Sequence, residues 1–173
     1  MQLETKRLIL REYTTADFDA LYAILSDPET MAHYPKPYDA AGVRRWIAWN
    51  EDNYKRYGFG LWAIVLKETG QFIGDCGITM QIIDGIQLPE LGYHIHKAHW
   101  QTGYAKEAAR TVLHWFFTQT DFDTLYSYTP CTNVPSIATA ASVGMKKEKE
   151  YIDQAGNLIC VSSISREDRV PEN

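Results

Sequence analysis

Cysteine is scarce in this sequence, which has Cys76, Cys131 and Cys160 and no others. Their odd number, their wide spacing and the lack of a CxxC pair exclude a disulfide framework and a zinc knuckle. We expect the three to be mostly buried, small, apolar residues. Cys131 is a poor candidate for a catalytic nucleophile, because no histidine lies at a recognisable spacing to activate it.

Long hydrophobic runs are also absent. In the opening stretch MQLETKRLILREYTTADF, charged residues interrupt each apolar run, which excludes a secretory signal or a membrane span there. Excess positive charge is lacking as well: 17 Lys and Arg stand against 22 Asp and Glu, for a net charge of -5. A broad nucleic-acid-binding face is therefore not expected. These absences predict a cytoplasmic protein that binds neither membranes nor nucleic acids.

The residues that are present are typical of one globular domain. Hydrophobic residues make up 45% and charged residues 23% of the 173 residues. This length allows one sizeable core and is short for two. No internal repeat, low-complexity tract or linker is visible. We therefore expect a single domain over residues 1–173.

Hydrophobic periodicity predicts the element order β-α-α-β-β-β-α-β-α-β-β, a mixed α/β domain. Capping and turn residues mark the helix boundaries: Thr14 or Thr15 before the first helix, Gly58 after the second and Gly144 after the last. Strands are expected at 6–13, 60–67, 71–83, 87–96 and 124–130 and twice within 145–168, and helices at 15–27, 43–57, after Gly103 and at 134–143.

The stretch HIHKAHWQTGYAKEAAR, residues 94–110, has two interpretations. In the first, His94 and His96 lie two apart on an expected strand and point to one face, as metal ligands can, with His99 just beyond. However, no carboxylate or fourth ligand is identifiable from the spacing. We expect no metal site, and we interpret the histidines as half-exposed residues of a strand and a loop.

The second interpretation is an anion-binding turn. WQTGYAKEAAR joins an expected strand to a long helix, and backbone N–H groups at a helix N-terminus bind phosphates. Another glycine-containing stretch, GFGLWA at residues 58–63, matches the letters of a dinucleotide-binding pattern, but it lies between a helix and a strand, in the reverse order. A nucleotide-binding switch is not favoured either, because the Lys and Ser or Thr of a P-loop are missing.

Four segments together resemble the GCN5-related N-acetyltransferases (GNAT), in the branch that includes ribosomal-protein alpha-N-acetyltransferases and many small-amine acetyltransferases. ETKRLILREYTTADFDAL is similar to that branch's first strand and helix, GFGLWAIVLKETGQFIGDCGI to its central hairpin, ELGYHIHKAHWQTGYAKEA to its acetyl-CoA motif and NVPSIATAASVGM to its last helix. The resemblance spans nearly the whole chain. It implies a twisted, mostly antiparallel central sheet of about seven strands with about four helices.

The resemblance also implies an acetyl-CoA site around the turn. The family's Q/R-x-x-G-x-G/A motif falls on residues 100–105, with Trp in place of the usual Gln or Arg. The pantetheine arm of the cofactor would pair with the backbone of Tyr93, His94 and Ile95, and the amide of Asn133 would hydrogen-bond that arm or an ordered water. The residues implied for the motif itself are Trp100, Gln101, Thr102, Gly103, Tyr104 and Ala105.

Acetyl transfer to an amine needs a base for the amine's proton and a donor that stabilises the departing thiolate. Glu90 stands where this branch often has its glutamate, and it is the expected base. An exposed Glu, with a pKa of about 4.3, would be too weak a base, so burial or a water relay is required. Many relatives have a tyrosine as the acid in the last helix, where this sequence has Ala140. Ser136, three residues after Asn133, stands where the resembled branch often has a serine near the cofactor sulfur, and the resemblance thus implies that it stabilises the thiolate.

The resemblance implies an enzyme that moves an acetyl group directly from acetyl-CoA to a primary amine, on a small molecule or at a protein N-terminus. A non-catalytic CoA- or acyl-CoA-binding module with the same fold is the alternative, against which Glu90 and Ser136 favour the enzyme. We expect a monomer or a homodimer. The acceptor stays open. Its side is expected to be lined by the loop at 31–42, the helix bearing Trp46 and Trp49 and the turn at Gln154 to Asn157, and loops diverge most.

Overall fold

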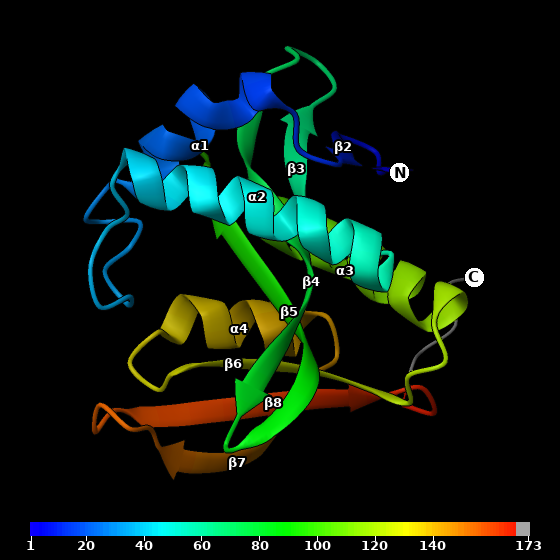
Figure 1. Ribbon diagram of the computed structural model, residues 1–173. Helices are drawn as coiled ribbons and strands as arrows, with labels where there is room; N and C mark the ends of the chain where they lie inside the picture. The colour runs from blue at the N-terminus through cyan, green and yellow to red at the C-terminus, as the bar shows by residue number, and fades with distance from the viewer. Residues whose placement is uncertain (169–173) are drawn as a thin grey trace.

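The computed structural model describes residues 1–168, and an eight-stranded sheet forms its centre (Figure 1). The strand order is β1-β2-β3-β4-β5-β6-β8-β7, and every neighbouring pair is antiparallel except β5 and β6. The strands are β1 (Gln2–Glu4), β2 (Leu8–Arg11), β3 (Leu61–Leu66), β4 (Phe72–Ile83), β5 (Ile86–Ile95), β6 (Thr124–Pro130), β7 (Lys146–Ile152) and β8 (Leu158–Ser165). The helices are α1 (Phe18–Leu25), α2 (Ala40–Tyr57), α3 (Tyr104–Gln119) and α4 (Val134–Ser142), with short 3-10 turns η1 (Thr15–Asp17) and η2 (Lys97–His99).

The expected mixed α/β architecture with four α-helices is confirmed, and the sheet has one strand more than the seven expected. The additional strand, β1, pairs with β2 through only three residues. A run this short shows no alternation that a sequence pattern could reveal.

Helix α2 differs slightly from the expectation at its start and agrees with it at its end. The helix begins at Ala40 because Asp39 caps it, with Oδ1 accepting the N–H of Gly42 at 2.6 Å. It ends where Gly58 adopts the left-handed conformation, at φ +76°. GFGLWA is therefore a helix stop followed by a strand, as expected.

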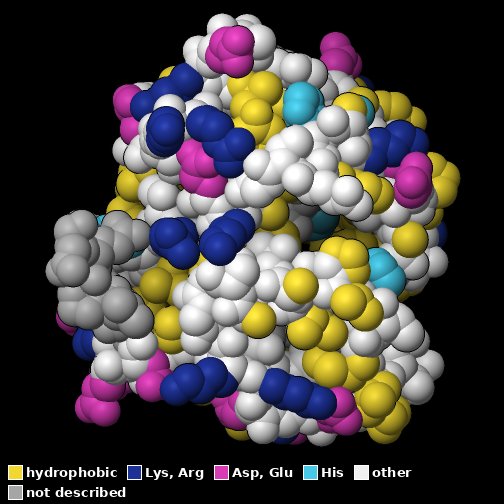
Figure 2. All heavy atoms as spheres, turned by 180° about the vertical axis from the view of Figure 1, so that it is seen from behind, with side chains coloured by type: hydrophobic (Ala, Val, Ile, Leu, Met, Phe, Trp, Pro, Cys, Tyr) yellow, Lys and Arg dark blue, Asp and Glu magenta, His cyan; other side chains and the backbone are white. Residues whose placement is uncertain are grey.

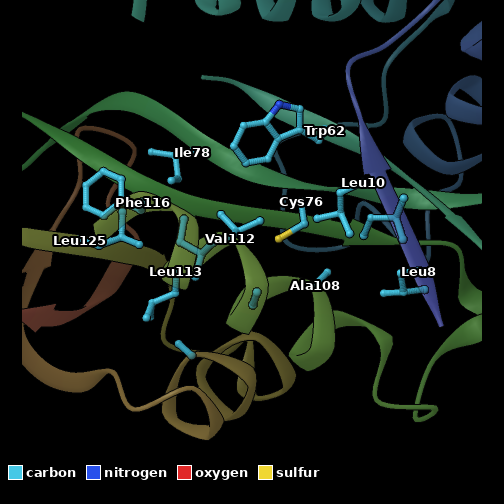
Figure 3. Packing of buried hydrophobic residues seen from close by; sticks show 14 of the residues in the cluster. Leu8, Leu10, Trp62, Cys76, Ile78, Ala108, Val112, Leu113, Phe116 and Leu125 are labelled. Atoms are coloured by element: carbon cyan, nitrogen blue, oxygen red, sulfur yellow. The ribbon is translucent and has the colours of Figure 1, made fainter. Parts of the chain in front are cut away.

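The helices cover the two faces of the sheet in pairs. In Figure 1, α2 lies in front of the sheet and α3 behind it. On the α3 side, Trp62 and Cys76 of the sheet pack against Val112 and Phe116 of the helix, as Figure 3 shows. On the other side, a separate apolar cluster lies beneath α1 and α2 and includes Leu61 and Ala63, which alternate with Trp62 along β3. The two faces of the central strands therefore serve different layers.

Cys76 and Cys160 are buried as expected, whereas Cys131 is half-buried, and the expectation of no disulfide is wrong. Cys131 and Cys160 form a disulfide, while Cys76 is buried and free. The pairing of β6 with β8 places Pro130 opposite Ile159, next to the two cysteines. The Cα atoms of Cys131 and Cys160 are thereby brought to 5.1 Å from each other. The two residues are 29 positions apart in sequence, so only the strand register brings them together.

Charges of both signs are mixed on the face of the molecule seen in Figure 2, where Lys and Arg side chains lie among Asp and Glu. None of the helices within residues 1–168 has the length and apolar character needed to cross a membrane.

Candidate active site

Strands β5 and β6 separate near the middle of the sheet. β5 pairs with β4 along its full length, Ile86–Ile95, and β6 pairs with β8 along its full length, Thr124–Pro130. In contrast, β5 and β6 meet only where Glu90 lies opposite Tyr126. Beyond this bridge, β6 leaves the edge of β5 at 93–95 uncovered. Such a gap between parallel strands can admit an extended ligand that pairs with the backbone.

The backbone of that edge is already partly engaged within the protein. The carbonyl of Ile95 accepts the indole N–H of Trp100 at 2.7 Å. The N–H of His94 donates to Oδ1 of Asp75 at 3.1 Å. Pairing of a pantetheine arm with residues 93–95 stays a prediction. Because backbone groups of His94 and Ile95 already have partners, Tyr93 has the most accessible backbone of the three.

The turn before α3 has the backbone shape of an anion cradle. Gly103, the N-cap of the helix, has φ +83°, and Gln101 has φ +60°. The first N–H groups of an α-helix lack partners within the helix, and the 16-residue helix α3 adds the positive end of its dipole. A Cβ placed on Gly103 would have one neighbour within 4 Å, Nη2 of Arg7 at 3.6 Å, so the turn is open to a ligand.

Arg7 braces this turn, a role that the sequence did not reveal. Its guanidinium donates to the carbonyl of Thr102 at 3.0 Å, pairs with Glu107 at 2.6 Å and lies 4.3 Å from the ring centre of Tyr104. A cation and the amide groups of the turn therefore lie side by side, an arrangement that suits a phosphate. The only sequence sign was a basic residue opening a strand, which is common on protein surfaces.

Polar groups on the other face of β4 and β5 are brought together by the strand register. Leu61 and Ala63 of β3 belong to the cluster beneath α1 and α2, and their partners Gly77 and Asp75 on β4 face the same way. Three cross-strand pairs of β4 and β5 therefore share this face in succession: Thr79 with Glu90, Gly77 with Gly92, and Asp75 with His94.

Glu90 lies at the vertex of the gap and is only 8% exposed. Burial raises the pKa of its carboxyl to about 8, while a hydrogen bond with Thr79 opposes the shift. The carboxyl leans over Gly92, since a Cβ on that glycine would lie 3.2 Å from Oε2 of Glu90. With a pKa of about 8 the carboxyl is mostly protonated at pH 7, so the base is its ionised fraction, which grows as pH rises. That fraction binds a proton more firmly than an exposed Glu would, which meets the requirement set for Glu90 as a base.

His94 is not the half-exposed residue that was expected. It is 8% exposed, and its Nδ1 lies 2.7 Å from Oδ1 of the fully buried Asp75. Its Nε2 lies 2.6 Å from the hydroxyl of Tyr34, and Oδ2 of Asp75 accepts the hydroxyl of Tyr13 at 2.5 Å. His94 is buried because the strand register places it opposite Asp75, an aspartate within the apolar run FIGDCGI.

His96 and His99 are half-buried, as expected, and His96 lies outside β5, where its ring accepts the N–H of Ala98. The part of the chain that the structure describes contains a single group of three candidate metal ligands, and it includes none of the histidines. That group consists of Cys131, Glu150 and Cys160, in which the two cysteines are bonded to each other.

The start of α4 faces the same gap from the α3 side of the sheet. Asn133 caps the helix, its Oδ1 accepting the N–H of Ser136 at 3.3 Å while its Nδ2 donates to Thr129 at 3.0 Å. The hydroxyl of Tyr93 donates to the carbonyl of Ser136 at 2.7 Å and lies 3.1 Å from its Oγ. Burial raises the pKa of the Tyr93 hydroxyl well above its usual range. Ala140, where relatives often have tyrosine, is buried.

Comparison with known proteins agrees with this layout. Residues 7–146 match the family model described as an acetyltransferase (GNAT) domain. The chain belongs to the GNAT acetyltransferases. It is an acetyltransferase enzyme with the GNAT fold, and the expected family is thereby confirmed.

Three relatives show the degree of similarity. The uncharacterized protein YkkB of Bacillus subtilis is 37% identical over 86% of this chain and 87% of its own. The uncharacterized N-acetyltransferase p20 of Bacillus licheniformis is 31% identical over 94% of each chain. A solved acetyltransferase from Agrobacterium tumefaciens is 29% identical and superposes with a TM-score of 0.81, covering 93% of both chains.

Proposed function

We propose that the protein transfers the acetyl group of acetyl-CoA directly to a primary amine, on a small molecule or at a protein N-terminus. The observation that carries this proposal is the buried carboxyl of Glu90 at the point where β5 and β6 part. A base that removes the amine's proton must lie beside the thioester, and the gap is where an extended thioester would lie. A binding module without chemistry would gain nothing from burying this carboxyl, which costs free energy.

The turn and the strand edge supply the cosubstrate site. The N–H groups at the turn of Gly103, with Arg7 beside them, suit the pyrophosphate of CoA, and the edge of β5 near Tyr93 suits its amide-containing arm. Acetyl-CoA supplies an activated acyl group. A spermidine N-acetyltransferase from Vibrio cholerae, solved with CoA and spermine, has the same fold at a TM-score of 0.76 and 14% identity.

The two sides of the sheet divide the chemistry between base and leaving group. On the side of α1 and α2, Glu90 accepts the proton of the attacking nitrogen. On the side of α4, the hydroxyl of Ser136 donates to the departing sulfur, and Asn133 holds the start of the helix that carries it. The proposed transfer is direct, and the bond between Cys131 and Cys160 supports it because it leaves no free thiol at Cys131 for an acyl intermediate.

The acceptor lies on the side of Glu90. A hollow of about 290 Å³ opens between the loop before α2 and the helix itself, lined by Tyr38, Gly42, Arg45, Trp46 and Trp49. The ring of Trp46 also contacts His94, at 5.5 Å between centroids. The hollow thus lies next to the polar pairs of β4 and β5.

Ligand-induced stabilisation tests the cosubstrate site. Acetyl-CoA at about 100 times its dissociation constant should add about 2.7 kcal/mol to the free energy of unfolding. At roughly 2–4 °C per kcal/mol for a domain of this size, the melting temperature should rise by several degrees. NAD should produce no shift, because its pattern at 58–63 is a helix stop. A shift with NAD and none with acetyl-CoA would overturn the proposal.

A further inference from the structure

A chain of four polar side chains crosses the apolar layer beneath α1 and α2. It runs from Tyr13 through Asp75 and His94 to Tyr34, with distances of 2.5, 2.7 and 2.6 Å between successive polar atoms. Asp75 and His94 are almost completely buried, whereas Tyr34 is 39% exposed at the end of the chain. Burying such groups in an apolar layer costs free energy. The row of hydrogen-bonded side chains therefore connects the interior to the acceptor side. Packing alone does not explain why the protein bears the free-energy cost of burying them.

The hydrogen bonds of Asp75 fix the direction of the chain. The carboxylate accepts the hydroxyl of Tyr13 and the backbone N–H of His94, and Nδ1 of the same histidine lies 2.7 Å from it. An ionised carboxylate can only accept, so the imidazole proton lies on Nδ1 and Nε2 is left as an acceptor. The hydroxyl of Tyr34 then donates to Nε2, and the lone pairs of its oxygen point away from His94.

The free side of Tyr34 lies within the electrostatic reach of Glu90. Although 39% of the Tyr34 residue is exposed, its hydroxyl is the inner end of the side chain and contacts the buried His94. Burial of this hydroxyl is the main reason that its pKa is raised well above its usual range, and the carboxyls of Glu90 and Asp75 raise it further. The imidazole of His94 contacts this hydroxyl at 2.6 Å, and the hydroxyls of Tyr38 and Tyr128 also act on it electrostatically. Tyr34 therefore keeps its proton at neutral pH and acts only by giving that proton up as it receives another.

Acetylation of an alkylamine requires two proton acceptors. An alkylammonium, like that of lysine with a pKa of about 10.4, is charged at neutral pH. Its nitrogen loses one proton to become a nucleophile and a second on forming the amide. One of these ends on the thiol of CoA, and the other returns to solvent. Glu90 can hold one proton at a time, so a second acceptor group would let a charged amine lose both protons within the site.

The geometry points to Tyr34 as that second group: it accepts the first proton of a charged amine while passing its own hydroxyl proton to Nε2 of His94. The phenol is restored, the amine becomes neutral, and the positive charge rests on the imidazole beside Asp75. Glu90 then takes the second proton, which ends on the CoA thiol. Tyr34 is the catalytic residue of this step, and His94 and Asp75 are positioning residues that act through it. The inference rests on the proposed function and names its substrate class as amines that are charged at neutral pH.

Two acceptors of similar shape test the step with Tyr34→Phe. Ethylamine is protonated at neutral pH, whereas trifluoroethylamine is largely neutral because its fluorines withdraw electrons. The variant should acetylate ethylamine about 10²-fold more slowly than wild type at pH 7 and trifluoroethylamine almost as fast. Its deficit with ethylamine should shrink as pH rises, because each pH unit raises the neutral fraction about tenfold. His94→Gln should show the same selective loss.

Two further variants separate the step from other effects. Tyr22→Phe removes a hydroxyl from a tyrosine of matching exposure, 38%, that stacks on Phe18 in α1; it should leave both rates unchanged. Glu90→Gln should slow both amines, because both must lose a proton on forming the amide. Equal loss with both amines for Tyr34→Phe, or no loss with either, would overturn the inference while leaving the transferase function intact.

The imidazole itself gives a readout that needs no acceptor. Nitrogen NMR of His94 in the wild-type protein should show the proton on Nδ1 and a bare, hydrogen-bonded Nε2, and Tyr34→Phe should change the Nε2 signal alone. A proton on Nε2 in the resting protein would contradict the proposed direction of the hydrogen bonds from Tyr34 to Asp75. If wild type binds acetyl-CoA yet acetylates no amine in a broad panel, the proposed function fails instead.

Discussion

At the scale of single residues, the chemistry of the site depends on how much water each carboxyl group loses on folding. Glu90 is buried and its pKa is raised to about 8, so it takes up a proton readily near neutral pH. Asp27, on the surface beside Lys97, has its pKa lowered to about 2 instead, chiefly by a hydrogen bond from that lysine. The same chemical group is a base in one place and a permanent charge in the other.

Glu90→Gln should lower the rate of acetyl transfer by about 10²–10⁴-fold if Glu90 is the base. The wild-type carboxyl becomes ionised as pH rises through about 8, so the ratio of wild-type to variant rate should grow from pH 6 to about 8 and then level off. Steady-state kinetics across this range measures the ratio. Wild-type turnover by the variant between pH 6 and 9 would remove Glu90 from the mechanism.

Stability provides a check on Glu90 that is independent of activity. The folded pKa is raised, so Glu90 contributes stability at low pH that is lost as pH rises from about 4.5, its ordinary value, to about 8. Denaturant titrations should show this component in wild type and not in Glu90→Gln. If the carboxyl were paired with a cation, its folded pKa would be lowered, and its contribution to stability would increase with pH instead of decreasing.

The residues of the site differ in how far sequence could identify them. Glu90 and Gly103 stand at motif positions, so their places were predictable, although the burial of Glu90 depends on packing. Asp75 and Tyr34 were missed, because they meet His94 only through strand register and a loop. A charged residue within the buried run FIGDCGI was the one available signal, since a buried charge requires partners.

At the scale of elements, the site depends on the parting of β5 from β6 and on the turn that follows β5. Alternation and 3.6-residue periodicity predicted the strands and helices that build it, because each is long enough to repeat its pattern. β1 is too short to do so. The parting of two parallel strands leaves no local pattern, so alternation and periodicity could not reveal it.

Gly103→Val should weaken acetyl-CoA binding by about tenfold or more. Gly103 has φ +83°, a conformation that costs a β-branched residue roughly 1–3 kcal/mol, and the added side chain would cover the cradle. Gly85→Val is the matched control: its φ is +81°, and nothing lies within 4 Å of a Cβ there. Calorimetric titration of both variants should show a loss in the first alone. Equal affinities would place the phosphates elsewhere.

At the scale of the whole molecule, the sheet separates two functions by its two faces. The α3 side carries the larger apolar core, part of which Figure 3 shows, and the turn for phosphates. The α1 and α2 side carries Glu90 and the hydrogen-bonded side chains that end at Tyr34. Both sides of the sheet are accessible from the gap between β5 and β6. A cosubstrate lying in the gap would present its thioester to acceptors from the opposite side.

The most direct test of this account is amine-dependent release of CoA thiol from acetyl-CoA, measured together with the mass of the amine product. The wild-type protein should release thiol at a rate that depends on the amine, and each thiol should match one amine heavier by one acetyl group. Tight binding of acetyl-CoA with no amine-dependent thiol release across a broad panel of amines and peptides would contradict the account and show a binding module with the same fold.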